Sequence, residues 1–217
     1  MKTVSVVMTT YNGEKYLREQ LDSIIQQTYP IYEIFIQDDY STDGTVSIVK
    51  NTPKYPNIKL FVNEHYIGFN KNFKNACMKA SGDFVAISDQ DDVWFPEKIE
   101  EQIQTIGNYS ICCSYLRVGN NLKTSRVFTK KNGFERILFG SHSGHTLLCK
   151  TSFIKEEKYW LPSILYNWSL GIKAHLCNGV AIVKQPLNWH RTYRQRQWAD
   201  GYCKRIFSYD FRLSTLV

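Results

Sequence analysis

The sequence predicts an α/β fold with a mostly parallel central sheet and helices on both of its faces. Two observations support this prediction. Short apolar runs rich in β-branched residues alternate with segments in which apolar residues recur at helical spacing. In the first half of the chain, a polar loop follows each apolar run. Strands that alternate with helices in this way need crossover connections, which produce a parallel sheet covered by helices.

The first half of the chain contains four such strands. Val4–Met8 is a continuous apolar run, as expected of a strand that is buried on both faces. The other three are Glu33–Gln37, Ile58–Val62 and Phe84–Ser88. Apolar stripes predict the helices between and after them, at Leu17, Leu21, Ile24 and Ile25, at Val46 and Val49, at Phe69, Phe73, Ala76, Cys77 and Ala80, and, after Pro96, at Ile99, Ile103 and Ile106. We expect Ser41 or Thr42 to cap the second helix.

The second half is less regular. Ile111–Leu116, Thr146–Cys149 and Val180–Val183 are predicted strands, and residues 117–133 are expected to form an exposed loop or hairpin. Helical spacing marks Trp168, Ile172 and Leu176 after Pro162, and Trp198, Tyr202 and Ile206 near the end. Since no repeat or linker interrupts the chain, we expect one domain over residues 1–217.

The net charge of +7 is unevenly distributed. Residues 1–101 hold 10 Lys and Arg against 15 Asp and Glu, whereas residues 102–183 hold 10 against 3. An acidic half suits a cation, and a basic half suits phosphates, an anionic membrane surface or nucleic acid, or is simply a solvated surface. No recognition motif accompanies the basic residues, so we expect no nucleic-acid partner.

Composition also bears on the cellular compartment. No run approaches twenty apolar residues, so no membrane-spanning helix is predicted. The N-terminus becomes polar too early for a signal peptide. The six cysteines form no CxxC pair, which argues against a zinc site. Free thiols without an export signal favour a cytoplasmic protein. Peripheral association with the inner face of the membrane and a homodimer remain open.

Three polar loops carry the candidate chemistry: Thr9–Asn12, Asp38–Asp43 and Asp89–Asp92. Each follows a predicted strand, and parallel sheets bind ligands beyond the carboxyl ends of their strands. Asp89 and Asp91 are two residues apart, so their carboxylates can lie on one side and repel each other. A hard divalent cation, Mg²⁺ or Mn²⁺, removes that repulsion. The alternative is that these acidic residues only cap the helices that follow them.

Taken together and in order, these segments resemble the family 2 inverting glycosyltransferases of the GT-A fold, a Rossmann-like single domain. The matching segments are residues 4–13, 26–29, 38–45, 63–68, 71–73, 82–83 and 88–98. The sequence Ser88-Asp89-Gln90-Asp91-Asp92-Val93-Trp94 is similar to the branch that contains rhamnosyltransferases of surface polysaccharide assembly.

The resemblance implies a nucleotide-sugar-binding half at residues 1–106 and an acceptor-binding half at residues 107–217. It implies transfer, with inversion, from a UDP- or dTDP-sugar to a glycan or lipid-linked acceptor. The donor-binding residues would be Thr9, Tyr11, Asp39, Lys71, Asn72 and Asp89. Mn²⁺ or Mg²⁺ would be held by Asp91, Asp89 and His190. Arg191, Arg194 and Arg196 could clamp a diphosphate or face anionic lipid.

One position departs from the family pattern. Where the family places the Asp that deprotonates the acceptor hydroxyl, this chain has Asn167, and a neutral amide is not a useful base. His145 is the candidate substitute, although it could also be an ordinary half-buried histidine. The departure leaves open a GT-A-like protein that binds a nucleotide sugar with weak or no transfer.

Overall fold

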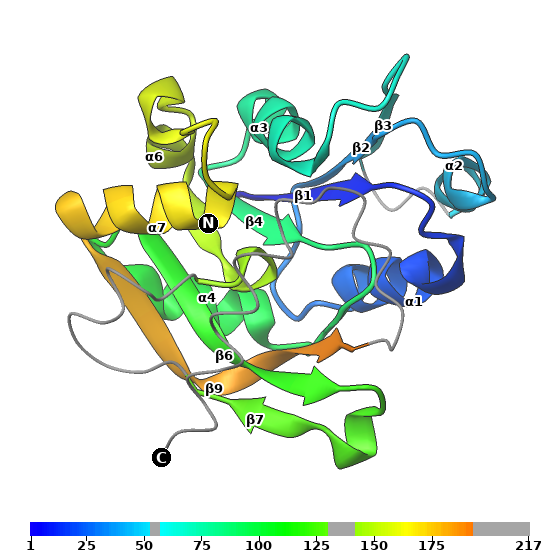
Figure 1. Cartoon of the computed structure of the whole chain (residues 1–217). Helices are drawn as coiled ribbons and strands as arrows, with labels where there is room; N and C mark the ends of the chain where they lie inside the picture. The colour runs from blue at the N-terminus through cyan, green and yellow to red at the C-terminus, as the bar shows by residue number, and fades with distance from the viewer. Residues whose placement is uncertain (53–56, 130–141, 193–217) are drawn as a thin grey trace, which may run out of the picture.

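A computed structural model describes residues 1–52, 57–129 and 142–192. Within these residues, one sheet of nine strands runs through the molecule, with helices above and below it (Figure 1). Eight of its strands have the order β3-β2-β1-β4-β8-β6-β9-β5, and the ninth, β7, pairs with β6. The α/β class, the mostly parallel sheet and the helices on both faces are confirmed.

The four strands of the first half lie side by side and parallel. They are β1 (Val4–Thr10), β2 (Glu33–Asp38), β3 (Ile58–Val62) and β4 (Phe84–Ser88). β1 lies between β2 and β4, and β3 forms the outer edge. The loops after β1, β2 and β4 therefore emerge at the same edge of the sheet, because parallel strands end on one side.

The second half extends the sheet through antiparallel pairing. β8 (Leu148–Lys150) lies between β4 and β6 (Ile111–Gly119) and is antiparallel to both. β9 (Val180–Arg191) runs parallel to β6 and pairs with the short β5 (Val93–Trp94). β7 (Arg126–Phe128) turns back onto β6 after the 3₁₀ turn Leu122–Thr124, so residues 117–128 of the predicted loop or hairpin form a hairpin.

Two apolar layers cover the sheet. One contains α1 (Glu14–Ile25), α2 (Thr45–Lys50) and α4 (Lys98–Ile106), and the other contains α3 (Phe69–Lys79), α6 (Thr151–Ile154) and α7 (Tyr166–Leu176). Neighbouring side chains of β1 enter different layers: Val6 and Met8 pack in the first and Val7 in the second. A strand between two covered faces must be apolar throughout, which explains the run at Val4–Met8.

One local prediction was wrong, two were confirmed with different details, and one is not tested. Neither Ser41 nor Thr42 caps α2, whose N-cap is Gly44; Asp43 accepts a hydrogen bond from the Thr45 amide instead. The helix after Pro162 exists, but Leu176 is 72% exposed, because the buried face of α7 is formed by Tyr166, Ser169, Leu170, Gly171 and Ala174. The strand predicted at Val180–Val183 continues to Arg191. The predicted helical stretch 198–206 lies outside the described residues.

The cysteines behave as small apolar side chains in four of the five described cases. Cys77, Cys112, Cys113 and Cys149 are buried free thiols, whereas Cys177 is exposed. Within the described ranges, none of the helices has the length and apolar character needed to cross a membrane.

A buried carboxylate joins β2 to its neighbours. Glu33 accepts hydrogen bonds from Ser5 Oγ at 2.6 Å and from the Ser81 amide at 2.7 Å, and it pairs with Lys59 Nζ at 2.8 Å. Burial works against ionisation of Glu33, but Lys59 and the two serines outweigh it and lower the pKa of Glu33 from 4.5 to about 2. The folded state therefore binds this proton less tightly than an unfolded chain.

We expect Glu33 to make the free energy of unfolding depend on pH in the acidic range. The stabilisation is complete above the unfolded pKa near 4.5 and is lost as the pH falls towards 2. It amounts to roughly 3 kcal/mol. Glu33→Gln should lower the free energy of unfolding at neutral pH and flatten this acid-side decline, as measured by urea unfolding over a pH series. Glu97→Gln, which changes an exposed carboxylate, is the matched control. An unchanged pH profile in Glu33→Gln would contradict the assignment.

Candidate active site

The loop after β4 is fastened to the loop after β1 by one side chain. Gln90 Oε1 accepts a hydrogen bond from the Tyr11 amide at 2.9 Å, and Gln90 Nε2 donates to the Tyr11 carbonyl at 3.0 Å. The terminal amide of Gln90 thus pairs with the backbone of Tyr11 as a neighbouring strand would. Gly13 leaves room for it, since a Cβ there would lie 2.2 Å from Gln90 Oε1. Gln90 therefore fixes the distance between the loop after β1 and the loop after β4.

Four side chains that can ligate a metal converge beside this clamp. Asp89, Asp92, His145 and His190 each place one ligand atom within 4.8 Å of the others. Asp92 is fully buried at the centre, with Oδ1 2.7 Å from His190 Nδ1 and Oδ2 in contact with His145 Nδ1. The two imidazoles stack with their centroids 4.6 Å apart. Asn188 Nδ2 lies 2.7 Å from His145 Nδ1.

The elements that hold these ligands explain why they meet. Asp89 and Asp92 follow β4, His145 lies in the 3₁₀ turn Gly144–Thr146 before β8, and His190 is near the end of β9. β5, which follows Asp92 directly, pairs with β9 through Val93 and Trp189. This pairing brings His190 to the acidic loop from 98 residues away in the sequence.

The two carboxyl groups of this cluster, Asp89 and Asp92, have pKa values shifted in opposite directions. Burial, together with the carboxylates of Asp92 and Asp91, raises the pKa of Asp89 to about 6 in spite of the two histidines. For Asp92, burial is outweighed by His145 and His190, which hold its pKa well below the usual value. The negative charge of the group therefore resides first on Asp92. Asp89 ionises fully only at higher pH, or where a cation balances its charge.

Asp91 lies outside this group of four. It is partly exposed, and its backbone carbonyl accepts a hydrogen bond from Arg191 Nε at 3.2 Å. The guanidinium of Arg191 also pairs with Glu19 and lies 4.3 Å from the centroid of the Trp189 ring. Arg191 is therefore occupied in tying β9 to α1 and the acidic loop. Arg194 and Arg196 fall outside the described residues.

The loop after β2 contains a second buried carboxylate. Asp39 Oδ1 accepts hydrogen bonds from Asn63 Nδ2 at 2.8 Å and from the Ile67 amide at 2.9 Å, and Oδ2 accepts one from the Gly68 amide at 2.9 Å. Gly68 has a φ of +84°, a conformation that favours glycine. Asp39 therefore shapes the segment 63–68, and neither Asp38 nor Asp39 only caps α2, since the Thr45 amide bonds Asp43.

Asn72 supports Asp39 indirectly, through a hydrogen bond with Asn63. Asn72 is 1% exposed; its Oδ1 accepts from Asn63 Nδ2 at 2.9 Å and its Nδ2 donates to the Gln37 carbonyl at 3.0 Å. Asn72 is thus placed to orient Asn63. Of the other predicted donor residues, Lys71 is exposed on α3 and Thr9 is partly buried on β1.

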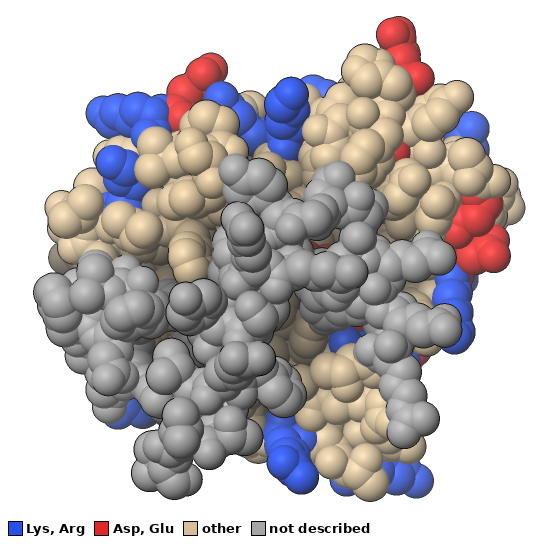
Figure 2. Space-filling view, in the orientation of Figure 1, with Lys and Arg blue, Asp and Glu red and all other residues tan. Residues whose placement is uncertain are grey.

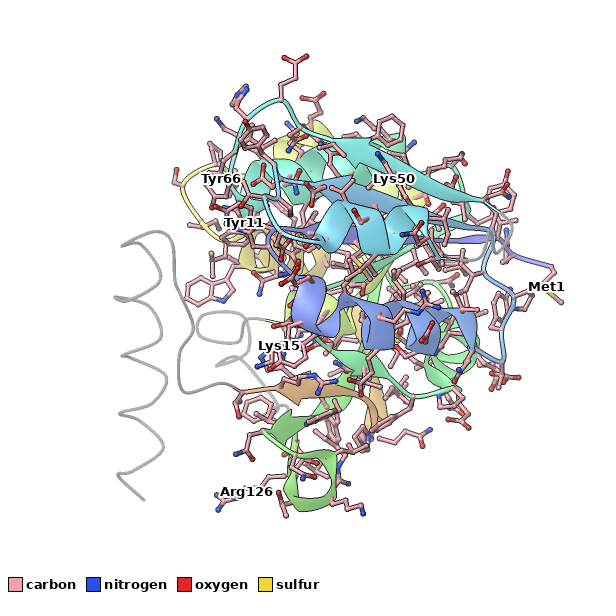
Figure 3. All side chains as sticks on the ribbon, turned by 90° about the vertical axis from the view of Figure 1, so that its right-hand side faces the viewer. Met1, Tyr11, Lys15, Lys50, Tyr66 and Arg126 are labelled. Atoms are coloured by element: carbon pink, nitrogen blue, oxygen red, sulfur yellow. The ribbon has the colours of Figure 1, made fainter. Side chains whose placement is uncertain are left out.

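Aromatic rings line the same edge of the sheet. Tyr11 is 41% exposed, and its ring lies 4.9 Å from that of Tyr66, the two being tilted by 53°. Figure 3 shows both tyrosines side by side on one side of the molecule. Asp39 and Tyr11 follow neighbouring parallel strands, so a flat ring system could contact both.

The N-terminus of α7 is attached to the segment that carries His145. Asn167 Nδ2 donates to the His142 carbonyl at 2.9 Å, and a Cβ on Gly144 would meet the Tyr166 hydroxyl. Asn70 of α3 accepts a hydrogen bond from the Tyr166 amide at 3.0 Å. Position 167 thus adjoins the turn that carries His145, and its amide has a structural partner.

Two residues of the site were missed by sequence reasoning. Asp92 was omitted although it adjoins Asp91, and Gln90 was given no role. No local signal marked Asp92, because its place at the centre of the group follows from the pairing of β5 with β9, which is distant in sequence.

The chain matches the family model described as Glycosyl transferase family 2 over residues 5–160, and it belongs to this family. It is 40% identical over 106 residues to the dTDP-rhamnosyl transferase RfbG of Shigella flexneri, which covers 46% of this chain and 36% of RfbG. This chain therefore spans about a third of the length of that relative.

Two solved structures share the fold. The crystal structure of residues 1–349 of S. aureus TarS with UDP-GlcNAc has a TM-score of 0.77 and 21% identity, covering 92% of this chain and 61% of that one. The mannosyltransferase PcManGT of Pyrobaculum calidifontis, in complex with GDP-Man and Mn2+, has a TM-score of 0.69 and 17% identity, covering 97% and 64%. The GT-A fold predicted from the loop motifs is confirmed.

The Gln90 clamp leads to a prediction about nucleotide binding. Gln90→Ala removes both hydrogen bonds to Tyr11, so we expect the affinity for a pyrimidine nucleoside diphosphate to fall about tenfold. Gly13→Ala, which displaces the Gln90 side chain, should have a similar effect. Gln104→Ala changes an exposed glutamine of α4 and is the control. Isothermal titration of the three variants measures the effect, and equal affinity in all three would contradict the clamp.

Proposed function

We propose that this protein transfers a sugar, with inversion, from a UDP- or dTDP-sugar to a glycan or lipid-linked acceptor in surface polysaccharide synthesis. The observation that carries the proposal is the convergence of Asp89, Asp92, His145 and His190 at the sheet edge that also holds Asp39. The group of four offers ligands for a cation that binds a diphosphate. Asp39 offers a hydrogen-bond acceptor for a nucleobase. Family membership supplies the reaction class.

The donor half supports a pyrimidine nucleotide. Uracil and thymine present an imide N–H between two carbonyls, and a carboxylate is the acceptor that suits it. Asp39 accepts three hydrogen bonds from the described residues, two of them at Oδ1, so Oδ2 retains capacity for a further donor. Tyr11 is exposed at the end of the adjacent strand and offers its ring for stacking. Thr9 and Lys71 would contribute further contacts, and Asn72 would act through Asn63.

The ligand set fits a divalent cation. Two carboxylates and two imidazoles suit Mn²⁺ better than Mg²⁺, which prefers oxygen ligands throughout. Such a cation would supply Lewis-acid stabilisation of the departing nucleoside diphosphate. We assign Asp92, Asp89 and His190 to the cation, and Asp91 remains a candidate ligand that a nucleotide could draw in. The fold relative PcManGT was solved in complex with GDP-Man and Mn2+, which supports a divalent cation as the cofactor.

The residues around the acceptor must accept a proton from its hydroxyl group. Asn167 occupies the position where the family has a carboxylate, and its amide donates to the His142 carbonyl. Asn167 would therefore orient the acceptor or the turn that carries His145. His145 is the candidate to receive the proton, unless it serves the cation together with Asp92.

A second candidate function follows from the same residue. A chain with an amide at position 167 could bind a nucleotide sugar and transfer it slowly, for example as the partner of another subunit. The two functions differ in turnover and not in binding. We expect this difference in turnover to arise from the acceptor-binding half, residues 107–217.

A binding screen followed by a transfer assay tests the proposal. UDP and dTDP with Mn²⁺ should raise the melting temperature more than either nucleotide without metal, and GDP should raise it less. Transfer from the sugar nucleotide that stabilises most should then be measured against a panel of glycan and lipid-linked acceptors. Stabilisation without turnover would favour the binding protein, and no shift with any pyrimidine nucleotide would refute both functions.

A further inference from the structure

The hairpin formed by β6 and β7 belongs to the sheet and has apolar side chains exposed at its end. All three residues of β7 are exposed, with Val127 at 46% and Phe128 at 56%, and Leu122 in the connecting turn is 37% exposed. In the described part of the chain, β7 pairs with β6 alone. Exposed apolar residues gathered in so short a stretch mark an interaction surface.

The turn is held in shape from within. Arg117 donates from Nε to Ser125 Oγ at 2.7 Å and from Nη2 to the Ser125 carbonyl at 3.0 Å. Ser125 Oγ donates in turn to the Leu122 carbonyl at 2.6 Å, and Asn121 Oδ1 accepts from the Lys123 amide at 2.9 Å. The apolar side chains are therefore presented by a preformed turn, so that little ordering is needed on binding.

The charge around these apolar residues is of one sign. The hairpin carries Arg117, Lys123 and Arg126, and the sequence has no Asp or Glu from residue 102 to residue 134. Lys123 and Arg126 are both exposed. In Figure 2 the lower edge of the molecule, where Figure 1 shows the hairpin, has blue Lys and Arg atoms and no red acidic atoms among those described.

We propose that the β6–β7 hairpin docks on an anionic lipid surface, with Leu122 and Phe128 entering the interface and Lys123 and Arg126 contacting the headgroups; Phe128 and Arg126 lie on the same face of β7. A stable peripheral contact needs both an apolar anchor and a basic patch, and the hairpin carries both. A second copy of this chain is disfavoured at this surface, because two such hairpins would bring like charges together.

The strand pairing fixes where the docked site would lie. Arg126 is opposite Val118 in the β6–β7 ladder, and Val118 is opposite His190 in the β6–β9 ladder. Neighbouring strands are about 5 Å apart, so β7 lies two strand spacings, about 10 Å, from the strand that carries His190. Figure 3 shows Arg126 at the lower end of the side on which Tyr11 and Tyr66 lie. A docked hairpin would therefore hold the candidate site close to the lipid surface.

Vesicle flotation tests this proposal without any transfer assay. The full chain is mixed with vesicles of phosphatidylcholine alone or with about one third phosphatidylglycerol. We expect flotation with the anionic vesicles only, at least about tenfold weaker for Lys123→Glu/Arg126→Glu. Lys50→Glu/Lys155→Glu, which makes the same charge change at exposed sites outside the hairpin, should bind like the parent. Equal losses in the two double variants, or no binding of the parent, would overturn the proposal.

Fluorescence quenching tests whether the exposed apolar side chains of the hairpin enter the lipid. Phe128→Trp should gain fluorescence that brominated lipids in the anionic vesicles quench, relative to the parent. Phe61→Trp, on the outer strand β3, is also an exposed aromatic position and should add no quenched signal. Equal quenching at both positions would show non-specific adsorption. Unquenched Phe128→Trp, or self-association or RNA binding through the hairpin without vesicle binding, would refute lipid as its partner.

Discussion

Asp92→Asn is expected to lower the rate of sugar transfer by about a hundredfold to a thousandfold. Asp92 contacts both histidines of the metal-ligating group, one through each of its oxygens. The substitution keeps the shape of the side chain but removes the charge on which the group depends. Losing a cation that stabilises the leaving group costs several kcal/mol, and each 1.36 kcal/mol is a factor of ten in rate.

Steady-state kinetics over a Mn²⁺ series measures this effect. The matched control is Asp91→Asn, because Asp91 is the adjacent acidic residue and is partly exposed. We expect the Asp92 variant to be the more impaired and to lose its response to Mn²⁺. Should Asp91→Asn abolish transfer while Asp92→Asn leaves the Mn²⁺ response unchanged, the ligand assignment derived from the geometry is wrong and the one implied by the sequence motif is right.

Asp39→Asn should remove the preference for pyrimidine nucleotides and also destabilise the protein by about 2–4 kcal/mol. The carboxylate of Asp39 is 2% exposed and accepts hydrogen bonds from Asn63 and two backbone amides. An amide group in its place turns an N–H₂ towards one of these donors. It also presents the wrong group to the imide of a pyrimidine.

Asp38→Asn separates the two effects. Asp38 is equally buried and accepts hydrogen bonds from Thr10 and Ser41, so its replacement should cost similar stability. We expect it to leave selectivity between UDP and GDP close to that of the parent, as measured by isothermal titration. If Asp39→Asn keeps the selectivity of the parent, Asp39 shapes the 63–68 segment without reading the base.

How far the sequence predicts this structure depends on the range of the interactions. Val4–Met8 could be read as a strand because its own residues are apolar on both faces. The capping of α2 could not, because Ser41 was already bonded to Asp38 and Asn12. The buried face of α7 was likewise set by a partner, since Asn70 and Gly144 fix Tyr166.

The candidate site shows the same limit. The acidic segment Asp89–Asp92 was identified from its own residues. Its position after a parallel strand predicted that it lies at the carboxyl edge of the sheet. Which acid sits at the centre was decided by β5, a strand of two residues whose only partner among the described strands is β9. Long-range pairing of this kind leaves no local periodicity, so Asp92 and its two histidines could not be grouped from sequence.

The central claim is that Asp89, Asp92 and His190, which converge with His145, form a binding site for one divalent cation. Electron paramagnetic resonance of free Mn²⁺ during titration with the protein tests it most directly, because the signal of the hydrated ion disappears on binding. We predict one tight site per chain, strengthened by UDP or dTDP and lost in His190→Ala. Retention of Mn²⁺ by His190→Ala with unchanged affinity, or the absence of binding by the parent with nucleotide present, would contradict the claim.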